Sequence, residues 1–321
     1  MKILITGASG FVGKALCREC VELGWNTVAV SRRTALYGRA VPADLCERFD
    51  IPFRPDVVVH AAARSSPWGR TAEFEAQNIQ ATRNVIDFCE RSGRPHLIHL
   101  STSAVLYRNE HQYGLNEETP PPAQFINEYA RTKYAAENLV RNYTGRSCIL
   151  RPRAVFGPGD TVIFPRILRA AQEGRFPKIE SDEPVMADLI YIDCLVQYIV
   201  RCIEQGAEGL YHVTNNEPVA ILSFLQNVFE RLGIDSPTRK VTAARALRAA
   251  RAIEFVHQAI PFLGEPAITP FGISVFAYSK TLDVQKALRD LGPPSLSLRE
   301  GVDAFVRWHS AAPLRPSYAV V

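Results

Sequence analysis

The first thirteen residues constrain the fold of this chain more than any other stretch. Ile3 to Ile5 form a short apolar run, which is typical of a buried strand. Three glycines at three-residue spacing follow, and apolar residues between the last two begin a helical pattern. The turn comprises Gly7, Ser9, Gly10, Phe11, Val12 and Gly13. Such a turn leaves backbone N–H groups free at a helix N-terminus, so we expect it to hold a pyrophosphate. A glycine-rich turn without a ligand is the alternative.

Apolar runs of strand length alternate with helical patterns as far as Arg151. We expect strands at 3–5, 26–31, 41–45, 56–60, 96–100 and 148–151, helices at 11–23, 74–89 and 125–143, and a loop at 108–123. The ten residues between Leu45 and Asp56 leave room only for a reduced crossover. This order predicts an α/β fold: a Rossmann doubly wound parallel sheet with a smaller, mostly helical C-terminal substrate-binding part.

The pattern becomes irregular after Pro152, which suggests a division of the chain. Residues 1–152 are expected to form the dinucleotide-binding domain, with a strand and a helix contributed from about 185–213. Residues 153–310 are expected to form mainly a substrate-binding region, followed by a tail at 311–321. The segment 243–260 is rich in Ala and Arg and predicts a helix. The wider segment 243–264 can serve as a lid or as a membrane-surface helix, and both alternatives stay open.

Charge and cysteine content narrow the classes of partner. The 321 residues carry 37 basic and 33 acidic side chains, a net charge of +4, and no basic run of five, so we expect no nucleic-acid binding. Met1 leads directly into the first apolar run, and no run approaches the roughly 18 residues of a membrane span. The seven cysteines are scattered, which favours free thiols in the cytoplasm. Cys17 and Cys20 have no second pair, so we expect no metal site.

Two arginines follow the second expected strand. Arg32 and Arg33 stand 19 and 20 residues past Gly13, where dinucleotide-binding units carry an acid for the ribose 2′-OH or an arginine for a 2′-phosphate. Two adjacent guanidinium groups suit a phosphate dianion. We therefore favour NADP(H) over NAD(H), although NAD also remains a candidate. A solvated basic turn is the alternative interpretation.

A tyrosine and a lysine supply the candidate chemistry. Tyr129 and Lys133 are four residues apart on an expected helix, so they share one face. A nearby ammonium group favours the phenolate and lowers the tyrosine pKa, which makes the pair a usable proton donor and acceptor. Ser101 and Ser103 follow the strand at 96–100, where parallel strands open to a ligand crevice. The Ser103 hydroxyl is expected to hydrogen-bond a substrate carbonyl beside Tyr129.

These motifs together resemble the extended short-chain dehydrogenases/reductases, the superfamily that includes NAD-dependent epimerases and dehydratases. The resemblance covers nearly the whole chain. It rests on the glycine turn at 6–13, Asp44-Leu45, His60 to Ala63, Asn78, the segments 101–105, 129–133 and 151–160, and the later segments 188–193 and 282–288.

The resemblance implies roles for individual residues. Tyr129 would be the general acid/base, and Lys133 would be its electrostatic partner and ribose ligand. Ser103 would orient the substrate oxygen, with Thr102 as the alternative. The remaining contacts are to the cofactor: Asp44 and Leu45 would meet the adenine, Ala61, Ala62 and Ala63 would line the cofactor, and Pro152 to Val155 would lie beside the nicotinamide.

Within this superfamily the residues favour an oxidoreductase. Dehydratases carry an acidic pair after the catalytic hydroxyl, whereas Ala104 and Val105 follow Ser103 here. The segments 65–69, 151–160 and 265–270 resemble the 3β-hydroxysteroid dehydrogenase and 2-alkyl-3-oxoalkanoate reductase branch, which acts on apolar or β-keto substrates. The alternatives are a sugar-nucleotide epimerase with tightly held NAD and a non-catalytic NADPH-binding sensor. A homodimer formed through a helix pair is one assembly that the resemblance implies.

Overall fold

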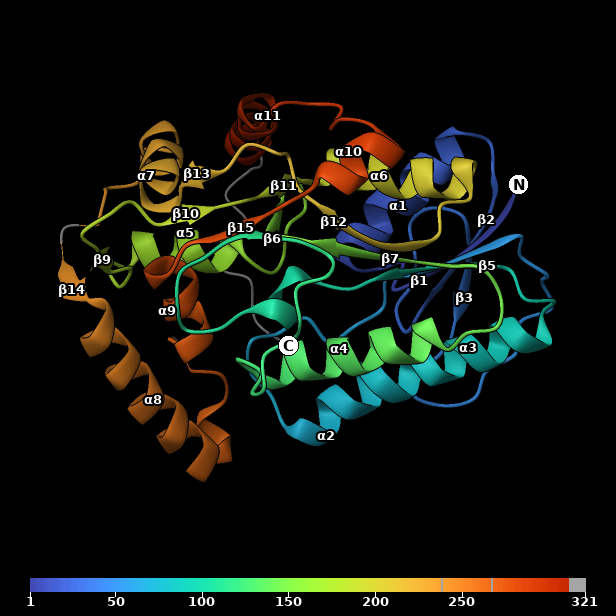
Figure 1. The fold of residues 1–321 in the computed structure, drawn as a ribbon, viewed down its shortest axis with the longest axis horizontal. Helices are drawn as coiled ribbons and strands as arrows, with labels where there is room; N and C mark the ends of the chain where they lie inside the picture. Colours follow the sequence, from blue (N-terminus) through green and yellow to red (C-terminus); the bar gives the residue numbers. More distant parts are fainter. Residues whose placement is uncertain (238, 267, 312–321) are drawn as a thin grey trace.

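Seven parallel strands form the central sheet of the protein (Figure 1). The computed structural model describes residues 1–237, 239–266 and 268–311. The strand order is β12-β7-β5-β4-β1-β2-β3. The strands are β1 (Lys2–Thr6), β2 (Asn26–Ser31), β3 (Arg39–Pro42), β4 (Val57–His60), β5 (His96–Leu100), β7 (Ser147–Pro152) and β12 (Gly209–Val213). This order reverses between β1 and β4, as in a doubly wound Rossmann sheet, so the predicted fold class is confirmed.

The central strand β1 is buried on both sides. Ile5 lies opposite Ala29 of β2 and opposite Val59 of β4. Side chains alternate along the strand, so Ile3 and Ile5 join one apolar cluster and Leu4 joins another. Helices cover both faces of the sheet, which is why β1 is a continuous apolar run. The carboxyl ends of β1 and β4 border the crevice where sheets of this type bind ligands.

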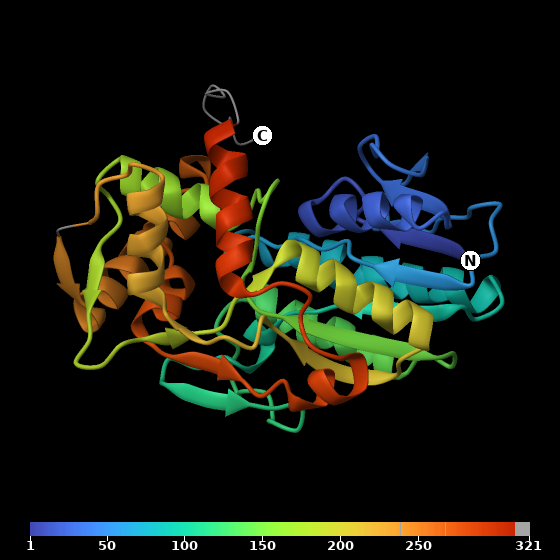
Figure 2. The same ribbon diagram turned by 90° about the horizontal axis from the view of Figure 1, so that it is seen from above.

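Two pairs of helices cover the two faces (Figures 1 and 2). On one face, α1 (Phe11–Glu22) packs against α6 (Ile192–Gln205). On the other face, α3 (Ala81–Arg91) packs against α4 (Glu128–Arg141). A short helix α2 (Thr71–Phe74) and a π-helical turn (Glu75–Gln80) run directly into α3, so the chain is helical from Thr71 to Arg91.

The carboxyl ends of β7 and β12 lead into a second part of the molecule. It holds a four-stranded sheet of order β13-β10-β15-β6 and two strand pairs, β11-β8 and β14-β9. The strands are β6 (Gln112–Leu115), β8 (Val155–Phe156), β9 (Lys178–Glu180), β10 (Met186–Ala187), β11 (Ile190–Tyr191), β13 (Val219–Ala220), β14 (Lys240–Thr242) and β15 (Lys280–Leu282). The helices are α5 (Phe164–Gln172), α7 (Ile221–Arg231), α8 (Ala243–Ala259), α9 (Pro270–Ala277), α10 (Gln285–Leu291) and α11 (Leu298–Ala311), with 3-10 turns η2 (Ser103–Leu106) and η3 (Pro261–Leu263).

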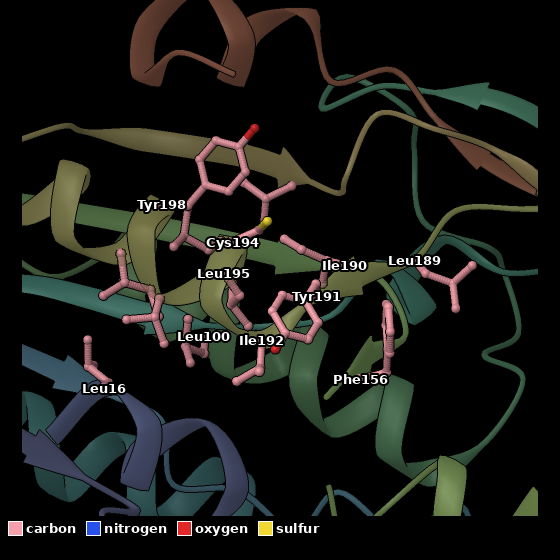
Figure 3. Packing of buried hydrophobic residues seen from close by; sticks show 14 of the residues in the cluster. Leu16, Leu100, Phe156, Leu189, Ile190, Tyr191, Ile192, Cys194, Leu195 and Tyr198 are labelled. Atoms are coloured by element: carbon pink, nitrogen blue, oxygen red, sulfur yellow. The ribbon is translucent and has the colours of Figure 1, made fainter. Parts of the chain in front are cut away.

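One continuous apolar core joins the two parts. Figure 3 shows buried side chains from β11 and the start of α6, with Leu16 of α1, Leu100 of β5 and Phe156 of β8 in the same cluster. Phe156 also contacts the rings of Phe164 and Phe305, which belong to α5 and α11. The second part therefore has an aromatic centre that is continuous with the apolar core of the Rossmann sheet.

Several element boundaries differ from the prediction. The third strand is Arg39–Pro42 rather than 41–45, so Asp44 and Leu45 lie in the turn beyond it. No helix occurs between β3 and β4 among these fully described residues, which confirms the reduced crossover. The helix α4 begins at Glu128 rather than Phe125, because the Asn127 side chain accepts a hydrogen bond from the N–H of Ala130 and caps it.

Two other predictions need correction or fall outside the structure. The expected loop at 108–123 contains β6, which pairs with β15 at a separation of about 170 residues along the chain. The helix expected at 74–89 begins at Thr71, where Glu73 accepts a hydrogen bond from the backbone N–H of Arg70. The predicted tail starts at Ala311, the last residue of α11, and residues 312–321 lie outside the described part of the chain.

Candidate active site and nucleotide-binding crevice

The glycine turn fits closely against its neighbours. Gly7 adopts a φ of +69°, a left-handed conformation that favours glycine, and a Cβ at this position would lie 2.7 Å from the backbone of Ala62. A Cβ on Gly13 would lie 2.2 Å from the carbonyl oxygen of Gly7. Gly13 therefore allows α1 to pack directly on the turn, and Gly7 allows the turn to pack on the residues after β4.

The N-terminus of α1 is open to an anion. Gly10 is the residue before the helix, and no side chain of this fully described turn caps it. Ser9 and Gly10 are exposed, and Phe11 and Val12 are half-buried. The first N–H groups of α1 therefore carry no side-chain cap, and the positive end of the helix dipole lies at this turn. This cradle of bare backbone fits the pyrophosphate of a dinucleotide.

Arginines and an acid meet where β2 and β3 end. Arg32 and Arg33 are both exposed directly after β2. Arg32 donates a hydrogen bond of 3.5 Å to the side chain of Gln77, and it also lies close enough to Asp44 to lower the pKa of that carboxyl group. The larger cause of this lowered pKa is the backbone N–H of Cys46, which donates to Asp44 at 3.0 Å. Leu45 is buried.

A buried histidine supports the end of β4. The ring of His60 lies 2.8 Å from the hydroxyl of Thr6 and 2.9 Å from the hydroxyl of Thr82. Burial, followed by the nearby charge of Lys133, lowers the pKa of His60 to about 3, so the ring is neutral. Ala61 and Ala62 are half-buried directly after it, and Ala63 is exposed. Small residues at this strand end leave the backbone accessible from the crevice.

Tyr129, Thr102 and Lys133 converge at the carboxyl end of β5. Burial raises the pKa of Tyr129 to about 12, and the nearby side chain of Thr102 partly opposes this effect. The Lys133 side chain reaches the same strand end, where its Nζ donates to the carbonyl oxygen of Leu100 at 2.6 Å and lies 3.2 Å from Nε2 of His99. The helix α4 thus presents both residues towards the end of β5.

The protonation of this cluster differs from the expectation. We expected Lys133 to lower the pKa of Tyr129, but burial keeps the phenol protonated at neutral pH. Burial also lowers the pKa of Lys133 to about 7, and the charge of Glu137 opposes this effect. His99 beneath it has a pKa well below its ordinary value because it is buried next to Lys133. Desolvation is therefore the largest influence on the pKa of each of these three groups.

The two serines after β5 are engaged elsewhere. Ser103 is buried, and its hydroxyl lies 2.7 Å from the hydroxyl of Tyr107. Tyr107 in turn accepts a hydrogen bond from Arg153. Ser101 donates to Glu137 at 2.5 Å, inside the buried ion pair between Glu137 and Arg151. The structure therefore brings Thr102, rather than Ser103, to Tyr129.

Asn78 organises this side of the crevice from the π-helical turn. Its side chain accepts the N–H of Arg64 at 2.7 Å, and it donates to the hydroxyl of Thr132 at 3.0 Å. It thereby connects the loop after β4 to the helix that carries Tyr129 and Lys133. The sequence named Asn78 only as part of the family pattern, since no local signal distinguishes a π-helical turn.

Other candidates lie farther along the crevice or in the core. Pro152 ends β7, and Val155 starts β8 after Ala154, whose φ is +42°. Phe276 packs on Phe176 with ring centroids 5.2 Å apart, so it is a core residue. Phe262, at 88% exposed, is a surface residue. These two aromatic residues therefore do not by themselves indicate an apolar pocket.

The comparisons with known proteins agree on one superfamily. The sequence model of the NAD dependent epimerase/dehydratase family matches residues 3–215. The chain is 29% identical to the 2-alkyl-3-oxoalkanoate reductase of Stenotrophomonas maltophilia, over 94% of this chain and 97% of that protein. It is 30% identical to the 3beta-hydroxysteroid-dehydrogenase/decarboxylase isoform 1 of Arabidopsis thaliana, over 93% of this chain and 77% of that protein.

A solved structure is similar to the whole chain. The structure of MoeE5 in complex with UDP-glucose and NAD aligns with a TM-score of 0.75 at 22% identity, over 97% of this chain and 99% of that chain. At this level of identity the similarity concerns the fold. The resemblance inferred from the sequence motifs is confirmed, including the branch that holds the reductase and the hydroxysteroid dehydrogenase.

Proposed function

This chain belongs to the NAD-dependent epimerase/dehydratase family, and on that premise we propose that it is an NADP(H)-dependent oxidoreductase acting on a secondary alcohol or ketone. The observation that carries the proposal is the meeting of Thr102, Tyr129 and Lys133 at the end of β5. The bound nicotinamide would supply or accept the hydride. The protein would position the substrate oxygen and move its proton.

Tyr129 is proposed to act as the general acid in reduction. A protonated phenol can donate its proton to the alkoxide as it develops, and burial keeps this phenol protonated. Thr102, which lies beside Tyr129, would turn its hydroxyl hydrogen to the same oxygen and donate a second hydrogen bond to it. Lys133 would bind the ribose hydroxyls and restore the proton of Tyr129. In the oxidation direction the same groups would act in reverse.

The substrate is proposed to be an apolar ketone or a β-keto compound. The support comes from the relatives, whose names refer to 2-alkyl-3-oxoalkanoates and to 3beta-hydroxysteroids. We propose that residues 1–152, with α6 and β12, bind the cofactor and that residues 153–310 mainly shape the substrate site. The seven cysteines are all free thiols, which supports a cytoplasmic location. We also propose that two copies of the chain form a homodimer.

Substitution of Tyr129 tests the mechanism. Tyr129→Phe removes the proton donor and is expected to lower kcat about 10²- to 10⁴-fold while NADPH binding persists. The measurement is NADPH absorbance with a panel of ketones, β-keto acids, steroids and UDP-sugars, together with NADPH affinity by fluorescence. Full turnover by Tyr129→Phe would contradict the mechanism. Tightly held NAD with no net cofactor turnover would instead support a sugar-nucleotide epimerase, and NADPH binding without any turnover would support a sensor.

A double substitution tests the cofactor. Arg32→Ala with Arg33→Ala removes both candidate 2′-phosphate ligands, so we expect the ratio of kcat/KM for NADPH over NADH to fall at least tenfold. Arg48→Ala, another exposed arginine near the end of β3, is the matched control. An unchanged ratio would refute the 2′-phosphate assignment.

A further inference from the structure

The end of α8 and the turn η3 expose a cluster of large apolar side chains. Among the described residues, ten large apolar side chains are exposed, and five of them lie within residues 255–263. Phe262 is 88% exposed and Phe255 is 72% exposed. The cluster, hereafter the α8 tip, consists of Phe255, Val256, Ile260, Phe262 and Leu263. Such a concentration differs from the single exposed apolar residues that are normal on protein surfaces.

The tip extends beyond the part of α8 that packs on the protein. The inner face of the first half of the helix buries Ala246, Leu247 and Ala250 against Ile273 and Ala277 of α9. In Figure 1, α8 continues past α9 towards its free lower end. Its last turns therefore expose apolar surface to solvent on the side facing away from α9.

The same outer face of α8 carries positive charge. Arg245, Arg248, Arg251 and Phe255 follow at spacings of three, three and four residues, so they form one stripe along the helix. All four are exposed. Arg239 and Lys240 just before the helix are exposed as well. The only acid within α8 is Glu254, which is partly buried on the inner side. The outer face thus combines three arginines with the apolar tip, and two further cations lie just before the helix.

We propose that this outer face docks on the surface of a lipid bilayer that contains anionic headgroups. The apolar tip would insert at the boundary between headgroups and acyl chains, and the arginines would contact the phosphates. Helices that lie in a bilayer surface combine a basic polar region with Phe and Leu in this way. A protein partner would need matching acids and an apolar hollow, whereas an anionic bilayer supplies both chemistries without a shaped site.

This docking would bring the membrane close to the crevice. His257, one residue past Val256, contacts Trp68 edge to face, with ring centroids 6.3 Å apart. Trp68 lies in the loop after β4, which Asn78 connects to the helix of Tyr129. If the proposed function holds, an apolar substrate could enter from the bilayer beside this loop. The docking itself does not depend on the reaction.

Vesicle flotation of the full chain tests the proposal. Vesicles of phosphatidylcholine alone are compared with vesicles containing about one-third phosphatidylglycerol. We expect binding to the anionic vesicles, and we expect added salt to weaken it. Phe255→Ser with Phe262→Ser should weaken binding at least about tenfold. Arg245→Gln, Arg248→Gln and Arg251→Gln together should weaken it on the order of a hundredfold.

Matched exposed positions provide the controls. Leu36→Ser removes an apolar side chain that is 70% exposed on the Rossmann part, and Arg289→Gln removes an exposed arginine of α10. Both controls should bind vesicles as the unchanged chain does. Thermal melting of each variant, with ketone reduction where it is measurable, verifies folding. Lost docking with retained reduction separates this proposal from the proposed function.

Two results would overturn the proposal. The first is an unchanged chain that fails to float with anionic vesicles, or variants of the tip that float as well as the controls. The second is a dimer, detected by light scattering, that the tip substitutions convert to a monomer in the absence of lipid. The second result would assign the tip to an interface between two copies of this chain.

Discussion

Two adjacent residues, Thr102 and Ser103, offer a hydroxyl near Tyr129, and a shift of one position along the chain determines which of them lies beside it. Ser103 and Thr102 are adjacent, and both follow β5 at the edge of the crevice. The 3-10 turn η2 begins at Ser103, and the Thr102 side chain caps it by accepting a hydrogen bond from Ala104. This turn directs Ser103 inward to Tyr107 and leaves Thr102 beside Tyr129.

We therefore predict unequal effects of the two hydroxyls. Thr102→Val removes a hydrogen-bond donor to the substrate oxygen and should lower kcat by about 10²-fold or more, with NADPH affinity unchanged. Ser103→Ala removes a buried hydrogen bond to Tyr107 and should cost about 1 kcal/mol of stability with a small change in kcat. Steady-state kinetics and thermal melting measure the two effects. A larger loss of kcat in Ser103→Ala would return the orienting role to Ser103.

Lys133 should make stability depend on pH. Burial lowers its pKa to about 7, whereas an unfolded chain has a lysine pKa near 10.4. Between these values the unfolded chain binds more protons, so this group's contribution to stability rises with pH and is least favourable below about pH 7. The Tm of the unchanged protein minus that of Lys133→Met should therefore increase from about pH 7 to about pH 10.

A lysine on the surface supplies the control for this experiment. Lys14 is exposed on α1, and Lys14→Met removes a lysine without touching the buried cluster. The prediction concerns the difference between the pH trends of the two variants. If both variants follow the unchanged protein in parallel across the window, Lys133 is not held in a desolvated site.

At the scale of elements, the close packing of the glycine turn against α1 leads to a specific prediction. Gly13→Ala places a Cβ 2.2 Å from the carbonyl oxygen of Gly7, so α1 must move away from the turn. We predict a loss of about 1–3 kcal/mol in the free energy of unfolding and a loss of cofactor binding. Gly174→Ala is the control, because its φ is +65° and a Cβ there meets no atom within 4 Å.

The Gly174→Ala control separates the cost of backbone strain from the cost of a steric clash. Gly174→Ala should lose about 1–2 kcal/mol through backbone strain alone and should bind cofactor normally. Urea unfolding measures stability, and fluorescence titration measures NADPH binding. Normal NADPH binding by Gly13→Ala would mean that the turn does not hold the pyrophosphate.

Elements formed by local pattern were predicted well, and those formed by distant pairing were not. The helix α1 and the strands β1, β2 and β5 depend on apolar runs and on turn residues close in sequence. By contrast, β6 is only four residues long, with a Gly and exposed central residues, and it becomes a strand by pairing with β15. The partner residues lie about 170 positions away, so no local window contains them.

At the scale of the whole molecule, the proposed division of labour can be tested. We predict that NADPH alone slows amide hydrogen exchange in α1, in the turn before it and in the residues after β2. Adding a substrate analogue should then slow exchange in α5, α8 and α9. Both effects follow from local ordering on binding. Protection of α8 and α9 by NADPH alone would show that the C-terminal part also binds the cofactor.

Within the described residues, no helix is long and apolar enough for a membrane span. The proposed contact with a membrane is made by the amphipathic helix α8, whose length and arginines were visible in the sequence. Which of its residues are exposed depends on α9, which covers only the first half of its inner face.

The sequence by itself determined the Rossmann sheet, the family and the glycine turn between β1 and α1. These features depend on patterns within short windows: a strand, a glycine turn and a helix within about twenty residues, and a tyrosine and a lysine one helical turn apart. Only the tertiary structure decided that Thr102 rather than Ser103 meets Tyr129, that burial controls the pKa of Tyr129 and Lys133, and that the α8 tip is exposed. Each of these depends on what surrounds a side chain in space, and residues distant in sequence provide those surroundings.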